Sequence, residues 1–185
     1  MKKLFIGLAA LSAFAAGTSQ AAVGAQGNIN FTGSINNDSC VVSGSGATNV
    51  GKNLLVDMGT VSANTLGTEA NPAVNGGGMS AFEKTIDLKV ECLSGTKVAL
   101  KLTPQTRSGK GIAVTGGASN VQIMLVNDNQ VLDFTTGSAS LEAPFNGGNV
   151  VIPMKAYYTL VQGKDVADVV AGQANATVAY ELSYD

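Results

Sequence analysis

The chain has 185 residues, 23 of them glycine, and contains neither histidine nor tryptophan. The lack of histidine excludes Ser-His-Asp and Cys-His catalysis and most transition-metal sites. With 11 basic against 13 acidic residues, the formal net charge is −2, so the chain lacks the strongly basic character of a nucleic-acid-binding protein. We therefore expect no cofactor, no metal and no nucleic-acid partner.

The N-terminus has the features of a secretory signal peptide. Two lysines precede an apolar run over residues 4–16, and small residues then stand at the positions that signal peptidase reads. This pattern predicts cleavage after Ala21. The alternative is a membrane anchor, but the run is too short to span a bilayer comfortably, and no later segment is long enough. We expect a signal peptide over residues 1–21 and an exported mature chain without a membrane span.

An alternating segment begins the mature chain. Over residues 23–35, apolar and small side chains fall on one face of an extended chain and polar side chains on the other. The first face carries Val23, Ala25, Gly27, Ile29 and Phe31. Such a face has to be buried somewhere, and the simplest interpretation is that the segment is the first strand of its own domain.

Two cysteines, Cys40 and Cys92, follow this segment. An even pair in an exported chain predicts a disulfide. Closing so long a loop would stabilise the fold by about 4 kcal/mol in the chain-entropy model. A metal site or a reactive thiol is the alternative, although two thiols without histidine cannot complete a metal site.

Further alternating segments indicate strands along the rest of the chain. Glycine- and asparagine-rich clusters separate them, and these residues tolerate the positive φ angles of tight turns. Many short strands joined by such turns predict an all-β sandwich. Pro153 predicts an edge or a bulge within its strand. The expected strands cover residues 54–58, 86–92, 97–103, 121–126, 150–158 and 176–184.

One segment has the spacing of a phosphate-binding loop. Residues 46–53 contain the required glycines and Lys52, but Asn53 replaces the hydroxyl residue that holds Mg²⁺ in such loops. Because no strand and helix are predicted on its two sides, we interpret it as a glycine-rich surface loop. Single carboxylates could pair in space as a glycosidase dyad, but the sequence does not show such a pair; they are Asp57, Glu69, Asp133 and Glu142.

The order and spacing of these segments resemble the type 1-like fimbrial subunits assembled by the chaperone–usher route. The resemblance covers essentially the whole mature chain. The matching stretches are residues 27–35 leading to Cys40, then 86–92, 121–124, 151–158 and 176–184.

The resemblance implies an immunoglobulin-like β-sandwich that lacks its final strand. A hydrophobic groove would then lie beside the C-terminal strand, and a neighbouring subunit would complete the sandwich by donor-strand exchange. Residues 22–32 would be the donor-strand extension and residues 33–185 the pilin domain. The groove-edge residues on the C-terminal strand would be Val178, Tyr180, Leu182 and Tyr184.

The implied function is structural rather than enzymatic. The chain would be a shaft subunit of a fimbria at the cell surface, in support of cell adhesion. Its partners would be identical or related pilin subunits, a periplasmic chaperone that fills the groove first, and an outer-membrane usher. Two alternatives remain: a minor adaptor or terminator pilin, and a monomeric secreted β-sandwich binding module.

Overall fold

Strands dominate the computed structural model, which describes residues 28, 30–32, 40–93, 95–145 and 148–185. The chain divides into two units, residues 1–36 and 37–185. In the first unit, the described residues are exposed and lie outside regular structure. The predicted signal peptide falls outside the described residues. The expected all-β sandwich is confirmed in the second unit.

The elements of the second unit follow one another with short connections. They are β1 (Cys40–Gly44), β2 (Thr48–Val50), β3 (Asn53–Leu55), the 3-10 helix η1 (Ala63–Thr65), β4 (Glu83–Thr85), β5 (Leu88–Cys92), β6 (Lys97–Pro104), β7 (Arg107–Ser108), β8 (Gly111–Ala113), β9 (Val121–Asn127), β10 (Gln130–Val131), β11 (Ala139–Pro144), β12 (Gly148–Ile152), β13 (Lys155–Leu160), η2 (Val166–Asp168) and β14 (Val178–Tyr184).

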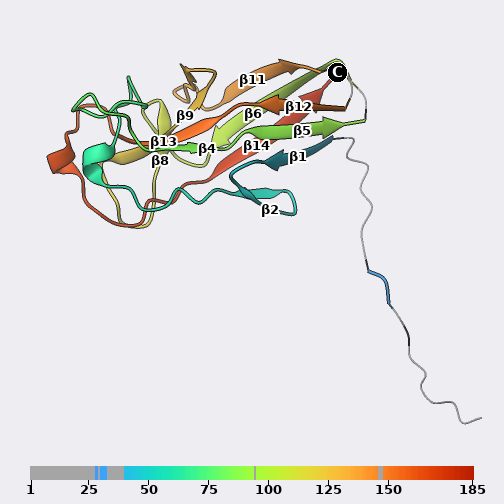
Figure 1. Cartoon of the computed structure of the whole chain (residues 1–185), viewed down its shortest axis with the longest axis horizontal. Helices are drawn as coiled ribbons and strands as arrows, with labels where there is room; N and C mark the ends of the chain where they lie inside the picture. The colour runs from blue at the N-terminus through green and yellow to red at the C-terminus, as the bar shows by residue number, and fades with distance from the viewer. Residues whose placement is uncertain (1–27, 29, 33–39, 94, 146–147) are drawn as a thin grey trace, which may run out of the picture. The chain divides into compact units, whose positions relative to one another are not determined.

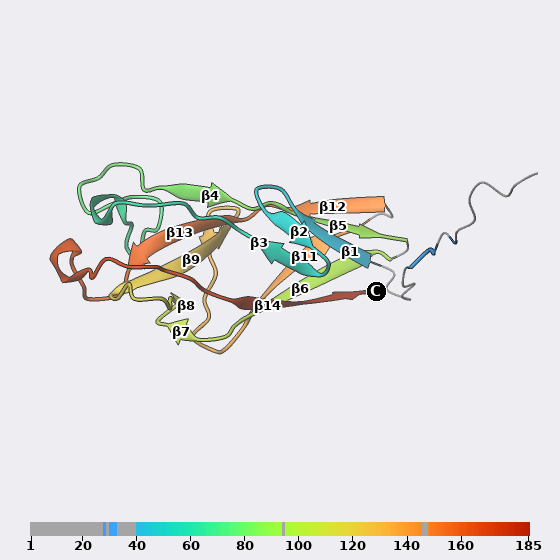
Figure 2. The same cartoon turned by 90° about the horizontal axis from the view of Figure 1, so that it is seen from below.

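The strands form two layers whose edges can be followed in Figures 1 and 2. One layer contains the sheet β1-β5-β12, and the opposite layer contains the sheet β11-β6-β14. A larger sheet, β4-β13-β9-β8-β7, continues the domain at the other end, with β10 paired to β9. Strands β2 and β3 form a separate hairpin.

The chain crosses between the sheet β1-β5-β12 and the larger sheet at two neighbouring points, from β4 to β5 and from β12 to β13. Strand β12 pairs with β5, whereas β13 pairs with β4 and β9. At the junction, the Ile86 amide donates to the Met154 carbonyl at 2.8 Å, and the Met154 amide donates to Asp87 Oδ1 at 3.3 Å. The expected strand over residues 150–158 is therefore wrong as one element: it breaks at Pro153, which has no amide hydrogen for a ladder.

The core lies between the two layers and follows the predicted alternation. On β6, the exposed fractions of Val98, Leu100 and Leu102 are 0, 0 and 4%, and the intervening side chains point outward. Leu88, Val90 and Cys92 of β5 belong to the same buried cluster. Each fully buried aliphatic side chain contributes about 1.5–3 kcal/mol, so the alternation itself supplies much of the stability. The expected continuous apolar strand is also present, because β9 is buried on both faces.

The segment with phosphate-loop spacing forms the hairpin β2–β3 instead. Its strand β3 covers residues 53–55, not the expected 54–58, and buried Met58 lies beyond it. Gly46 and Gly51 both have positive φ, +73° and +61°, which glycine adopts without a steric penalty. A Cβ on Gly46 would lie 2.3 Å from the Thr85 carbonyl oxygen, whereas a Cβ on Gly51 would meet nothing within 4 Å.

These two glycines give a matched test of the packing at the hairpin base. We expect Gly46→Ala to lower the free energy of unfolding by about 2–4 kcal/mol, because the strain of a positive φ adds to a backbone clash. Gly51→Ala carries the strain alone and is expected to lower it by about 1 kcal/mol. Urea unfolding of the two variants measures the difference. Equal losses would mean that the base of the hairpin is not packed against β4 as described.

Candidate functional site

Two strands at one border of the sandwich have an unpaired edge within the described part of the chain. Strand β14 pairs with β6 from Val178 opposite Pro104 to Tyr184 opposite Val98, and it ends its sheet. Strand β1 pairs with β5 and likewise ends its sheet. An edge strand presents a row of amide and carbonyl groups that can pair with another chain. These two edge strands define the candidate site.

The inner faces of the two edge strands are apolar and incompletely covered. Val178, Tyr180 and Leu182 of β14 are half-buried and pack against the core, as do Cys40 and Val42 of β1. By contrast, the inward residues of the neighbouring strand β6 are at most 4% exposed. We call the half-buried apolar residues of the two edge strands the open edge: Cys40, Val42, Val178, Tyr180 and Leu182. An apolar strip with edge strands on both sides can accept an additional strand.

Strand β14 alternates as its sequence pattern predicts, with one exception. The intervening residues Ala179, Glu181 and Ser183 are exposed. Tyr184 is 42% exposed, although the pattern places it on the inner face. It lies at the end of the strand, next to the turn between β5 and β6, where less of the core is available to cover it. The role of these residues as a groove edge stays a prediction.

The structure contains the disulfide between Cys40 and Cys92. The two residues are direct partners in the β1–β5 ladder, with a Cα–Cα distance of 4.1 Å. The bond therefore ties an edge strand to a core strand whose Val90 is fully buried. Because β1 forms one side of the open edge, the disulfide also holds that side in place.

The predicted donor face lies mostly outside the described residues. This applies to Val23, Ala25, Gly27 and Ile29, whose roles stay predictions. Phe31 is described and is 93% exposed. Asn28 and Asn30, assigned to the opposite face, are also exposed.

Sequence reasoning missed the contribution of the β2–β3 hairpin to this border. Leu54 and Val56 pack against the core beside the open edge, and the Tyr180 hydroxyl donates to the Lys52 carbonyl at 2.6 Å. A short-range signal was present, since Gly51 lies in a turn between two short runs with strand character. No local sequence pattern could predict the contact between Tyr180 and Lys52, because the two residues are 128 positions apart.

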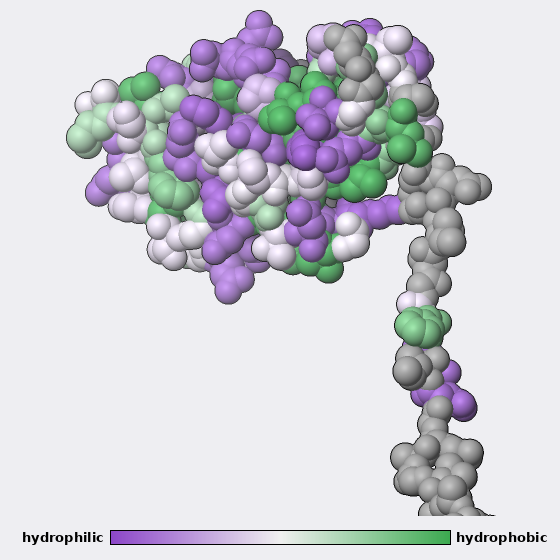
Figure 3. Space-filling view, turned by 45° about the vertical axis from the view of Figure 1, so that its right-hand side comes forward, coloured by the Kyte–Doolittle hydropathy of each residue, from purple (hydrophilic) through white to green (hydrophobic). Residues whose placement is uncertain are grey.

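On the face of the domain that Figure 3 shows, hydrophilic and hydrophobic side chains are intermixed. The four carboxylates considered for a dyad each have a hydrogen-bond or ion-pair partner. Asp57 accepts a bond from the Gly59 amide, and Glu142 pairs with Lys97 at 2.6 Å. Hydrogen bonds from the side chain and amide of Thr135 hold the pKa of Asp133 below its ordinary value. Asp133 also lies 4.0 Å from Lys110 Nζ.

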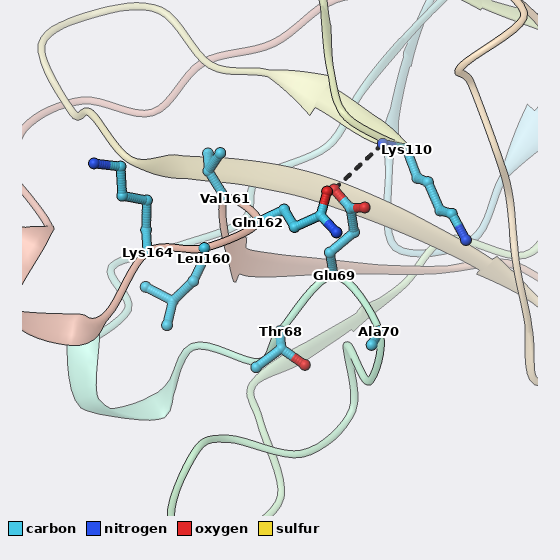
Figure 4. Close-up of a pocket in the computed structure, with 9 residues that line it drawn as sticks. Thr68, Glu69, Ala70, Lys110, Leu160, Val161, Gln162 and Lys164 are labelled. Carbon is cyan, nitrogen blue, oxygen red and sulfur yellow. Dashed lines mark hydrogen bonds between the residues drawn. The ribbon is translucent and has the colours of Figure 1, made fainter.

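The remaining carboxylate, Glu69, lies beside a cavity of about 260 Å³ (Figure 4). Its Oε2 accepts hydrogen bonds from the Gln122 side chain at 3.1 Å and from the Lys110 amide at 3.3 Å. Gln122 is fully buried, so this carboxylate fixes the loop around it to β9. The two hydrogen bonds give Glu69 a structural role at this cavity.

Another carboxylate contact stabilises the large sheet. Glu83 of β4 accepts a bond from the Tyr157 hydroxyl at 2.7 Å and from Lys155 Nζ at 3.1 Å. Desolvation, together with the bond to Glu83, raises the pKa of Tyr157 to about 12. The bonds from Tyr157 and Lys155 lower the pKa of Glu83. At neutral pH, Glu83 therefore stays ionised and Tyr157 stays protonated, so the hydrogen bond between them is kept.

Comparison with known proteins places the fold and the family. A family model described as "Fimbrial protein" matches residues 29–185. The F17 fimbrial protein of Escherichia coli is 28% identical over 183 residues, covering 92% of this chain and 96% of that protein.

Solved structures of low identity share the fold. The P pilus rod subunit PapA has a TM-score of 0.56 at 19% identity, over 80% of this chain and 99% of that one. A subunit in the structure of a chaperone–usher pilus has a TM-score of 0.55 at 20% identity, over 90% of this chain and all of that one. The CupB6 tip adhesin of Pseudomonas aeruginosa matches over 70% of this chain but only 35% of its own length, with a TM-score of 0.53 at 17% identity. Within the described residues, no helix has the length and apolar character needed to cross a bilayer.

Proposed function

The chain belongs to the fimbrial protein family and is a pilus subunit, and we propose that it forms the shaft of a chaperone–usher pilus by donor-strand exchange. The family is one of structural subunits, not of enzymes. Its members are surface-exposed components of pili and polymerise with other pilin subunits. The proposal concerns how this subunit is joined to the next.

The observation that carries the proposal is the open edge between β1 and β14. Both strands end their sheets, and the residues facing inward from them are apolar and half-buried. A strand laid along this edge would form main-chain hydrogen bonds with β14, and its alternate side chains would cover Val178, Tyr180 and Leu182. Such strand addition combines generic main-chain affinity with side-chain specificity.

The proposed occupant is the extension of a neighbouring subunit, residues 22–32. Phe31 is 93% exposed in the chain by itself, and burying it together with Val23 and Ile29 would contribute about 1.5–3 kcal/mol for each side chain. Gly27 suits a position where the floor of the groove approaches the incoming backbone. The remaining residues, 33–185, would form the body of the subunit.

The route to the surface follows from the same groove. Cleavage of residues 1–21 would release the subunit into the periplasm with an incompletely covered edge, which is an aggregation hazard. A periplasmic chaperone would cover that edge until an outer-membrane usher exchanges it for the next subunit's extension. A shaft subunit needs both a donor extension and an acceptor groove; an adaptor or terminator pilin is the nearest alternative within the family.

A self-complemented chain tests the proposal. We expect a copy of residues 22–32, fused through a flexible linker after Asp185, to raise the melting temperature of the mature chain by about 10 °C or more. The physical reason is that the copy fills the groove of its own subunit. The measurement is a thermal unfolding scan of the fused and unfused chains.

A matched control carries the same fusion with Ile29→Asn and Phe31→Asn in the copy only. This copy has the same length and main-chain hydrogen bonds but no large apolar side chains at those positions. We expect it to give less than half of the gain. If the unfused chain melts cooperatively at the temperature of the fused one, the subunit is not missing a strand and the proposal is wrong.

A further inference from the structure

The β2–β3 hairpin lies across the open edge that a donor strand would occupy. Figure 2 shows the hairpin between β1 and β14, and in Figure 1, a view turned by 90°, β2 lies on the side of β1 away from β5. Contacts agree with this position. The Gly44 amide at the end of β1 donates to Asn49 Oδ1 at 3.3 Å, and on the other side the Tyr180 hydroxyl of β14 donates to the Lys52 carbonyl at 2.6 Å.

The hairpin is fixed at its base and lightly held at its tip. At the base, the Ser45 amide donates to the Asp87 carbonyl at 3.0 Å, and Gly46 packs directly against the Thr85 carbonyl. At the tip, a Cβ on Gly51 would have open space around it, and the side chain of Val50, which pairs with Asn53 next to the turn, is 52% exposed. A segment with this distribution of contacts can pivot about its base.

Two contacts between the hairpin and the rest of the domain are of modest strength. The bond from Tyr180 to Lys52 is solvent-exposed, so water competes with it, and the inner contact is made mainly by Leu54, which is only half-buried. A strand paired along the free edge of β14 would lie about 4.8 Å from it, in the space between β1 and β14 over which Figure 2 shows the hairpin. Such a strand would make several ladder hydrogen bonds and would displace the hydroxyl bond from Tyr180 to the Lys52 carbonyl.

We propose that the β2–β3 hairpin is a movable cover of the acceptor groove, closed over the open edge in the unassembled subunit and displaced when a donor strand enters. This inference rests on the proposed function, since it needs a strand that occupies the groove. The cover shields the apolar strip of β1 and β14 from unspecific pairing, the purpose that protected edges serve in other β-proteins. It opens for a strand whose ladder hydrogen bonds and apolar contacts outweigh those that the hairpin makes with β1, β14 and the core.

Hydrogen exchange on the mature chain, with and without the fused copy of residues 22–32, tests the inference. We expect the amides of residues 178–184 to exchange more slowly in the fused chain, because β14 gains a partner. We expect those of residues 48–55 to exchange at least about tenfold faster, because the hairpin loses its anchor. The fused copy with Ile29→Asn and Phe31→Asn is the control and should change neither segment as much.

The two segments separate failure of the inference from failure of the proposed function. Slower exchange in β14 with unchanged or slower exchange in the hairpin would overturn the cover while leaving strand insertion in place. Unchanged exchange in β14 would overturn strand insertion, and the cover with it.

A second measurement uses the hydroxyl that holds the tip. We expect Tyr180→Phe, which keeps the ring, to increase the rate of uptake of a synthetic peptide of residues 22–32 by about 2- to 10-fold, the effect of removing one hydrogen bond from the closed state. Tyr158→Phe is the matched control, because it also removes a hydroxyl bond to a carbonyl, that of Ala174 at 2.7 Å, away from the open edge. Peptide uptake is followed by native mass spectrometry. An unchanged or slower rate for Tyr180→Phe, or equal acceleration by both variants, would contradict the cover.

Discussion

Ile29→Asp is expected to abolish polymerisation while the subunit still folds against its chaperone. In the proposed donor strand, Ile29 enters the groove of a neighbouring subunit, where an isolated charge in a dry pocket costs several kcal/mol. The groove that would receive it is lined by half-buried apolar residues of β1 and β14. The measurement is the ladder of polymers on unboiled gels, read beside the amount of subunit bound to chaperone.

The adjacent substitution Asn28→Asp is the matched control for Ile29→Asp. It introduces the same charge one residue away, and strand alternation places it on the opposite face, so polymers are expected to form. Normal polymerisation of Ile29→Asp would remove this residue from the donor face. Loss of the chaperone-bound subunit would instead assign the segment to the core of its own domain.

Removal of the disulfide is expected to have the second large effect. In the double variant Cys40→Ala, Cys92→Ala, the unfolded chain regains the freedom of a loop with a sequence separation of 52 residues, which lowers the free energy of unfolding by about 4 kcal/mol. A small domain has only about 5–15 kcal/mol in total, so little folded subunit should accumulate in the periplasm. Quantitative blotting of periplasmic extracts measures the loss.

The double substitution avoids a lone reactive thiol, and each Cys→Ser single variant checks that the loss comes from the bond. Loss of the disulfide also affects the open edge. Without the bond to Cys92, strand β1 keeps only its ladder to β5, so that one side of the open edge is less firmly held. A double variant that accumulates and polymerises at the parental level would contradict both the stabilising role and the positioning role of the disulfide.

Alternation of apolar and polar residues was sufficient to predict the central strands. A period of two is a local property, and on β6 it places Val98, Leu100 and Leu102 in the core as expected. The pattern could not predict where a strand changes sheets. That event depends on Pro153 and on the Asp87 side chain, which accepts a bond from the Met154 amide across 67 positions of sequence.

The candidate site was predictable on one side only. The C-terminal pattern predicted that Val178, Tyr180 and Leu182 face inward, because inward residues of an edge strand still alternate. Their role as a groove edge was implied by the resemblance and stays a prediction. The hairpin over the site was missed, because its glycines and Lys52 first resemble a phosphate-binding loop and its position depends on contacts with distant strands. Burial on the open edge is also a property of the tertiary structure: the same alternation gives fully buried residues on β6 and half-buried ones on β14.

The identity of the strand beside β14 in the assembled fibre is the central claim, and electron cryo-microscopy of the fibre tests it most directly. We predict continuous density from residues 22–32 of one subunit lying between β1 and β14 of its neighbour, with Val23, Ile29 and Phe31 directed toward Tyr180 and Leu182. A fibre in which the space between β1 and β14 holds the subunit's own extension, or only its own hairpin, would contradict the account.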